Sequence, residues 1–113
     1  GVHFRPAMFE PTFHKHAKQA CGGCQIHVTD RRAFRAVLTG VALTAAFKAM
    51  DAGFSWRQPP YEYEYTKLPF DILAGSADTR EQIEAGVPPE TIAKSWDADV
   101  ARFDAIRRRF LMY

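Results

Sequence analysis

The chain has 113 residues, which is the length of one ordinary domain. Hydrophobic residues make up 47% and charged residues 25%, a balance typical of globular domains that fold without a metal or a disulfide. The net charge of +2 is too small to indicate a nucleic-acid or membrane partner, and no apolar run reaches the roughly 18–20 residues of a membrane span.

The amino end reads GVHFRPAMF, without an initiator Met. A basic segment followed by an apolar one is missing there, so we expect no signal peptide within the chain. We interpret residues 1–113 as a single domain taken from a larger protein. An intact small protein with a trimmed tag is the alternative.

The first predicted element is a strand over residues 2–9, where apolar and polar side chains alternate loosely. Pro6 places this strand at a sheet edge or a strand end. A loop is expected over residues 10–23, in which Gly22 and Gly23 mark a turn or a close backbone approach.

A second strand is predicted for CQIHVTD, residues 24–30. Ile26 and Val28 would point to one side of it. The other side would carry Gln25, His27 and Thr29. Asp30 can accept backbone N–H bonds where the strand turns toward the next helix.

A helix apolar around most of its circumference is predicted from about residue 35 to residue 51, with Gly53 as its stop. The proline-containing stretch that follows, residues 54–75, reads as irregular, with a possible short strand at YEYEY, residues 61–65.

Two more helices are predicted near the carboxyl end. The first covers residues 79–85, with Asp78 and Glu81 as an N-terminal capping pair. The last begins at residues 88–89, and its arginine run at 107–109 suits the negative end of a helix. Its apolar stripe consists of Ile92, Trp96, Val100, Phe103, Ile106 and Phe110. The fold class is therefore α+β, a small sheet of a few strands packed against a long central helix and a carboxy-terminal helix.

The segment HKHAKQACGGCQIHVTD contains three histidines and two cysteines, which could hold zinc. A single C-x-x-C without a second pair is a weak zinc signal, so we predict no metal site. A thioredoxin-like couple fits less well, because Cys24 enters a strand and not a helix start. A disulfide or two inert thiols at Cys21 and Cys24 explains the pair more simply.

Glu62 and Glu64 could share one face of a strand at a separation near that of glycosidase carboxylates. Same-face carboxylates beside prolines are more typical of a solvated edge. Pyranose rings stack on aromatic faces, and Trp56, Tyr61 and Tyr63 are candidates for that, whereas Trp96 belongs to the core.

The order of several motifs resembles a bacterial family once catalogued as a domain of unknown function, the carboxy-terminal domain of NamZ-like exo-β-N-acetylmuramidases. The resemblance covers essentially the whole chain. It is carried by Phe9-x-Pro11-Thr12-Phe13-x-Lys15, Cys21-x-Gly23, His27-Val28-Thr29-Asp30, Phe70-Asp71-x-Leu73-x-Gly75, Trp96 and Phe103…Arg107…Leu111-x-Tyr113. Family members vary at Cys24, which argues further against a C-x-x-C function.

The resemblance implies a glycoside hydrolase that removes N-acetylmuramic acid from the non-reducing ends of peptidoglycan fragments. Its catalytic carboxylates are expected on an upstream Rossmann-like domain of the same protein, with the active cleft between the two domains. The chain itself would hold no catalytic residue, would need no cofactor and would be inactive in isolation. Wall material as the substrate suggests a periplasmic or extracellular location.

In this interpretation the present domain forms one wall of the substrate cleft. Arg5 and Lys15 are expected to bind the lactyl carboxylate of muramic acid. His27, Thr29 and Asp30 are expected to bind sugar hydroxyls or the acetamido group. The alternative function is a non-catalytic module that binds peptidoglycan or a partner protein.

Overall fold

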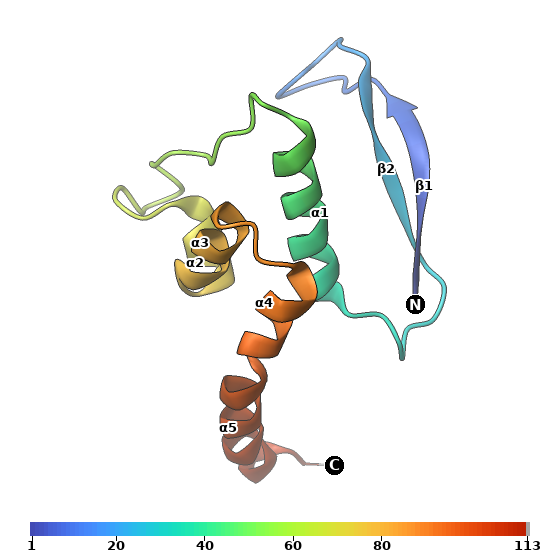
Figure 1. Ribbon diagram of the computed structural model, residues 1–113. Coiled ribbons are helices and arrows are strands. Elements are labelled where there is room, and N and C mark those ends of the chain that lie inside the picture. Colours follow the sequence, from blue (N-terminus) through green and yellow to red (C-terminus); the bar gives the residue numbers. More distant parts are fainter. Residues whose placement is uncertain (113) are drawn as a thin grey trace. The chain divides into compact units, whose positions relative to one another are not determined.

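The computed structural model describes residues 1–112, and within them the fold is α+β, a two-stranded sheet followed by five α-helices (Figure 1). The chain divides into two compact units, Gly1–Ala36 and Val37–Tyr113, here called the hairpin unit and the helical unit. The elements are β1 (Val2–Phe9), β2 (Cys21–Val28), α1 (Ala36–Met50), α2 (Pro69–Ala74), α3 (Asp78–Glu84), α4 (Pro89–Ser95), α5 (Asp97–Arg107) and a 3-10 turn (Arg108–Phe110). No helix within the described residues has the length and apolar character needed to cross a membrane.

The two strands form an antiparallel hairpin in which Val2 lies opposite Val28 and Phe9 opposite Cys21. The Gly1 carbonyl accepts the Thr29 N–H at 3.0 Å. Because hydrogen-bonded and non-hydrogen-bonded pairs alternate along an antiparallel ladder, the odd-numbered residues of β1 are the hydrogen-bonded ones. Pro6 therefore occupies a position where the sheet needs no N–H donor, which explains a proline in the middle of a strand.

Gly22 and Gly23 lie inside β2, opposite Met8 and Ala7, so of the two roles predicted for this pair, a turn or a close backbone approach, the turn is wrong. A Cβ at Gly22 would lie 3.5 Å from Met8 Sδ, and one at Gly23 would lie 3.3 Å from Phe9 Cε1. The first of these distances is an ordinary van der Waals contact, and only a Cβ at Gly23 would be slightly too close to its neighbour. The chain reverses in the segment between the strands, residues 10–20, instead.

The hairpin unit has an apolar side formed by the even-numbered residues of both strands. Phe4 and Ile26 face each other there and are 41% and 45% exposed. None of residues 1–36, all of which the structure describes, is buried. The hairpin therefore has paired strands but no enclosed core of its own.

The helical unit is built around a core of Val41, Ile83 and Ile92, which come from α1, α3 and α4. Trp96 packs against this core, as its place in the apolar stripe predicts. The partly buried side chains around it also include Ala45, Trp56, Phe70 and Val87. Burial of these side chains is the main favourable contribution to the stability of this unit.

The proline-containing segment between α1 and α3 is more ordered than the sequence indicates. A short helix, α2, begins at Pro69, where a missing N–H costs nothing, and ends at Gly75, whose φ of 88° is left-handed. The predicted strand at residues 61–65 is wrong, because only an isolated bridge joins Tyr61 and Glu64.

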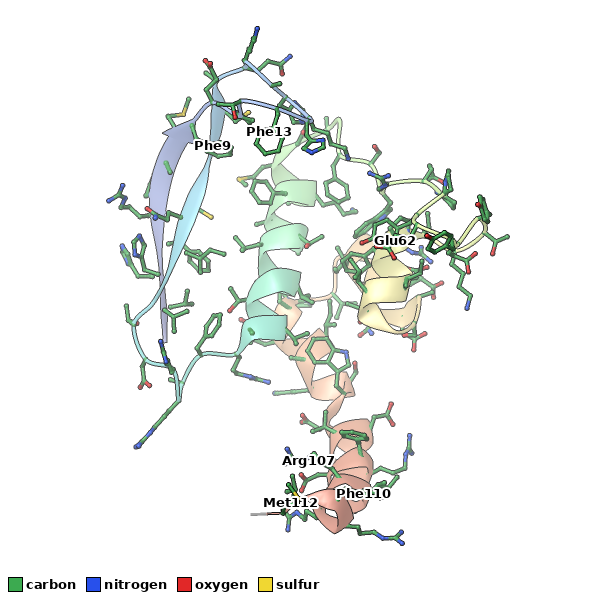
Figure 2. All side chains as sticks on the ribbon, turned by 180° about the vertical axis from the view of Figure 1, so that it is seen from behind. Phe9, Phe13, Glu62, Arg107, Phe110 and Met112 are labelled. Atoms are coloured by element: carbon green, nitrogen blue, oxygen red, sulfur yellow. The ribbon has the colours of Figure 1, made fainter. Side chains whose placement is uncertain are left out.

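The predicted last helix is two helices. The N–H of Trp96 bonds to Ala93, three residues back, and α5 starts anew at Asp97. Beyond this break the apolar stripe leaves the core, and Phe110 lies at the far end of the segment (Figure 2). Exposure of this part is high at Val100 (61%), Phe103 (63%), Ile106 (50%) and Phe110 (76%).

Charged side chains have different roles at the start of α3 and at the end of α5. The predicted Asp78–Glu81 capping pair is wrong, because the residue that caps α3 is Ala77, and the side chain that bonds to the first N–H of the helix is that of Ser76, at 3.3 Å. At the carboxyl end, Arg107 and Arg108 both pair with Asp104, at 2.8 and 2.6 Å. The arginine run thus bonds to its own helix, and these hydrogen bonds lower the pKa of Asp104.

Candidate functional site on the hairpin

The odd-numbered residues of the two strands share one face of the hairpin, and the half of this face nearer the amino terminus is polar and exposed. The register there places Arg5 opposite Gln25. His27, the next odd-numbered residue of β2, is exposed and lies on the same face. The structure thus brings Arg5 and His27 together, with Thr29 following at the end of β2 in the same alternation. We call this surface the polar face.

His3 also belongs to the polar face, directly opposite His27. Residues opposite each other in an antiparallel pair have Cβ atoms about 4.5–5.5 Å apart, so the two imidazoles are neighbours. Sequence reasoning missed His3 as a site residue. The alternation of residues 2–9 does put it on the side of Arg5, but only the strand register reveals that it faces His27.

Asp30 performs the structural role that the sequence predicts. Its Oδ1 accepts the N–H of Arg32 at 2.8 Å and that of Ala33 at 3.4 Å. Its carbonyl accepts the N–H of Phe34 at 3.0 Å. The carboxylate therefore holds the turn that leaves β2, and replacing it with alanine would disturb this turn as well as any ligand contact.

Lys15 lies apart from Arg5, on the segment that joins the strands at the end remote from the amino terminus (Figure 1). Arg5 and the strand end at Phe9 are four positions apart along β1. At a rise of about 3.3 Å per residue this is about 13 Å. The structure does not place the two predicted carboxylate-binding cations side by side.

Both cysteines are free thiols, and both are partly exposed. They lie three residues apart on β2, so they point to opposite faces of the sheet. Cys21 Sγ lies 3.4 Å from the Gln19 carbonyl, to which it can donate. Among the described residues, no group of three or more His, Cys, Asp or Glu side chains is arranged to hold a metal ion.

Glu64, one of the two glutamates considered as a carboxylate pair, is held by hydrogen bonds within its own turn. Glu64 Oε1 accepts the N–H of Thr66 at 2.7 Å, its hydroxyl at 2.6 Å and the N–H of Lys67 at 3.1 Å. These hydrogen bonds, the Thr66 hydroxyl first, lower the pKa of Glu64 to about 2. A carboxyl with this pKa stays ionised at neutral pH and has no proton to give to a leaving group.

A recess of about 630 Å³ in the helical unit is lined partly by Asp71 and Arg80. The guanidinium donates to both oxygens of Asp71, at 2.8 and 3.1 Å, and to Glu84 at 3.2 Å. These bonds, above all those to Asp71, raise the pKa of Arg80. The guanidinium of Arg80 is therefore engaged by its neighbours and joins α2 to α3, and Lys67 is a second cation that lines the recess.

The three aromatic candidates for sugar stacking differ in their surroundings. Trp56 packs its ring against Phe70 at a centroid distance of 4.6 Å, within the core of the helical unit. Tyr61 lies beneath the Arg57 guanidinium at 5.9 Å, and Tyr63 is 92% exposed. Trp56 is therefore a structural residue, and Tyr63 is free to meet a ligand.

These features define a small α+β domain that displays basic and hydrogen-bonding side chains on an exposed hairpin. Residues 1–113 match the family model described as exo-β-N-acetylmuramidase NamZ, C-terminal, and the chain belongs to this family.

A curated relative is the peptidoglycan β-N-acetylmuramidase NamZ of Bacillus subtilis (strain 168), 36% identical over 114 residues. The match covers 100% of this chain and 26% of the relative, so the chain spans about a quarter of the length of that protein. No solved structure shows a significant match.

Proposed function

We propose that residues 1–113 are a single domain, the carboxy-terminal part of a two-part glycosidase that removes N-acetylmuramic acid from the non-reducing ends of peptidoglycan fragments. The observation that carries the proposal is the family match over the whole chain. The relative from Bacillus subtilis supports it, since the chain aligns over its full length with a protein named as a peptidoglycan β-N-acetylmuramidase.

The chemistry assigns the catalytic step to another part of the protein. Glycoside hydrolysis requires two carboxyl groups that flank the scissile bond, one of which donates a proton to the leaving oxygen. Glu64 is held ionised by the hydrogen bonds of its turn and has no proton to donate at neutral pH. We place the catalytic carboxylates on an upstream Rossmann-like domain, as the family resemblance implies, and this chain then contributes a wall of the substrate cleft.

The polar face is the part of the wall that meets the terminal sugar. Arg5 is exposed at mid-strand, where its planar guanidinium can bind the lactyl carboxylate through two parallel hydrogen bonds. His27 and Thr29 can donate to sugar hydroxyls or the acetamido carbonyl, and His3 is placed to act with His27. Asp30 follows Thr29 in the chain. Its turn uses only Oδ1, so Oδ2 can accept a hydrogen bond from the ligand.

The test uses the longer protein that carries this chain and a chromogenic muramide as substrate. Arg5→Gln and His27→Asn should each raise KM or lower kcat/KM about tenfold or more, because each removes a hydrogen-bonded contact to the ligand. Asp30→Asn, which keeps the Oδ1 acceptor, separates ligand contact from the turn. Arg109→Gln is the matched control, an exposed arginine of the helical unit.

Two results would contradict this assignment. Unchanged kinetics in both the Arg5 and the His27 variants would remove the polar face from the cleft. Release of muramic acid by residues 1–113 alone would show that the catalytic acids are in this chain.

A second function, a non-catalytic peptidoglycan-binding module, is favoured by the full exposure of the polar face. Saturable binding of muropeptides by residues 1–113, together with a longer protein that releases no muramic acid, would support it over the cleft domain.

A further inference from the structure

Charge is distributed unevenly between the two units. The hairpin unit contains six Lys and Arg residues against two Asp and Glu, a net charge of +4. The helical unit contains nine against eleven, a net charge of −2. The small net charge of the whole chain therefore conceals a basic unit, which would attract an anionic ligand.

The cations nearest the hairpin tip lie in one segment, Thr12–Gln19, here called the tip loop. His14, His16 and Lys18 have φ values of 62°, 58° and 59°. Left-handed backbone is uncommon outside glycine, and strained residues of this kind concentrate at functional sites. Three of them at alternate positions give the loop a defined shape that the sequence does not reveal.

Hydrogen bonds close the tip loop at its base. The N–H of Lys18 donates to the Pro11 carbonyl at 2.8 Å, and the N–H of Gln19 donates to the His16 carbonyl at 3.0 Å. His16 Nδ1 lies 3.3 Å from the Gln19 side-chain oxygen. The side chains of residues 14–16 and 18 are all exposed, so the loop presents them to solvent.

The two lysines of the tip loop are unpaired. In the part of the chain that the structure describes, neither Lys15 nor Lys18 lies in an ion pair, whereas Arg80, Arg102, Arg107 and Arg108 of the helical unit each do. An unpaired ammonium group retains its full capacity to bind an external anion.

Exposed aromatic rings accompany these cations. Phe9 and Phe13 lie at the loop end of the hairpin and are 55% and 71% exposed (Figure 2). The Phe13 ring also lies 4.9 Å from the His14 ring, tilted by 58°. A flat apolar ring next to ammonium and imidazole groups suits a ligand with both an apolar sugar face and a negative charge.

We propose that the tip loop is a second binding subsite, one that holds a carboxylate-bearing sugar chain at a distance from the terminal residue. The ligand is the same peptidoglycan strand, and its identity rests on the function proposed above. Arg5 and the polar face hold the terminal sugar, and the tip loop, beyond the strand end about 13 Å away, binds carboxylates further along the strand. Phe13, which belongs to the tip loop, stacks on a sugar ring that lies between the terminal sugar and these carboxylates.

The experiment measures equilibrium binding of soluble, uncross-linked peptidoglycan strands by the longer protein, next to neutral N-acetylglucosamine oligomers. The test variant is Lys15→Gln/Lys18→Asn, because asparagine tolerates the left-handed backbone at position 18. The matched control is Lys67→Gln/Lys94→Gln, which removes two exposed lysines from the helical unit. Circular dichroism tests whether all variants are folded.

The expected result is about tenfold weaker binding of the peptidoglycan strands by the test variant, since each exposed ion pair contributes a few-fold. The salt dependence of binding should also flatten. The control variant should bind as the unmodified protein does, and neutral oligomers should be unaffected by either change. Unchanged strand binding, or an equal loss for neutral oligomers, overturns the proposal.

A separate assay distinguishes this result from failure of the proposed function. Release from the small chromogenic muramide by the unmodified protein tests the glycosidase alone, because that substrate is too short to reach the tip loop. Lost strand binding in the test variant supports the subsite even if no muramide is cleaved. Conversely, cleavage by the unmodified protein with intact strand binding in the test variant refutes the subsite alone.

Discussion

Ile92 and Phe103 belong to the same apolar stripe in the sequence, yet Ile92 is fully buried and Phe103 is 63% exposed. We expect Ile92→Ala to lower the free energy of unfolding by about 2–5 kcal/mol, because it opens a cavity between α1, α3 and α4. Phe103→Ala should cost less than about 1 kcal/mol. Urea denaturation of both variants measures the difference. A larger loss for Phe103→Ala would mean that α5 is packed more tightly than its exposure indicates.

The carboxylate of Glu64 gives a prediction about pH. Hydrogen bonds from Thr66 and Lys67 lower its pKa from 4.5 to about 2. A lowered pKa in the folded state means that the contribution to stability is present above about pH 4.5 and is lost as the pH falls toward 2. Thr66→Val should raise the pKa of Glu64 toward its ordinary value, while Thr66→Ser should keep it low. An NMR titration of the side-chain carboxyl carbon measures this, and an unchanged midpoint in Thr66→Val would contradict it.

At the scale of single elements, substitutions at two glycines should have opposite effects, because one glycine ends a helix and the other lies inside one. Gly75 ends α2 with a φ of 88°, a conformation that a Cβ disfavours, so Gly75→Ala should destabilise the fold by about 1 kcal/mol. Gly40 lies inside α1, where a Cβ would meet nothing within 4 Å, and Gly40→Ala should stabilise it by about 0.5–1 kcal/mol. Thermal unfolding of both variants distinguishes the signs. Equal shifts in the same direction would contradict this view of the two positions.

Periodicity predicts the elements whose side chains follow one rule along their whole length. The alternation of residues 2–9 and the apolar residues of α1 both lead to the observed element. The predictions fail where a local sequence pattern competes with the pairing or packing of elements. Gly22 and Gly23 resemble a turn, but they lie in a strand, where they pair with Met8 and Ala7. The continuous stripe of residues 92–110 conceals the break at Trp96, since the spacing is the same on either side of it.

The candidate site, like the fold, is only partly predictable from the sequence. Alternation within each strand is enough to place Arg5 with His3, and His27 with Thr29, because side-chain direction has a period of two. The pairing of His3 with His27 depends on the register between the strands. That register depends on the length and shape of the tip loop, where three non-glycine residues adopt left-handed backbone that composition does not signal.

At the scale of the whole molecule, burial is concentrated in the helical unit. Val41, Ile83 and Ile92 are buried there, whereas none of residues 1–36 is. A two-stranded hairpin is marginally stable by itself in water. In residues 1–113 alone we therefore expect the amide protons of β1 and β2 to exchange at least about tenfold faster than the amide of Ile92, which donates to the Pro88 carbonyl at 3.0 Å.

The proposed cleft also predicts how fast the amide protons of β1 and β2 exchange in the longer protein. If the hairpin forms one wall of a cleft, the domain that completes the cleft also shields part of the hairpin and makes its opening less favourable. Exchange at β1 and β2 should therefore slow about tenfold or more in the longer protein that carries this chain, while exchange at Ile92 changes little. Hydrogen exchange followed by mass spectrometry on both proteins tests this. Equal protection of the hairpin in the two proteins would mean that no other domain covers it, and the polar face would then be a free binding surface and not the wall of a cleft.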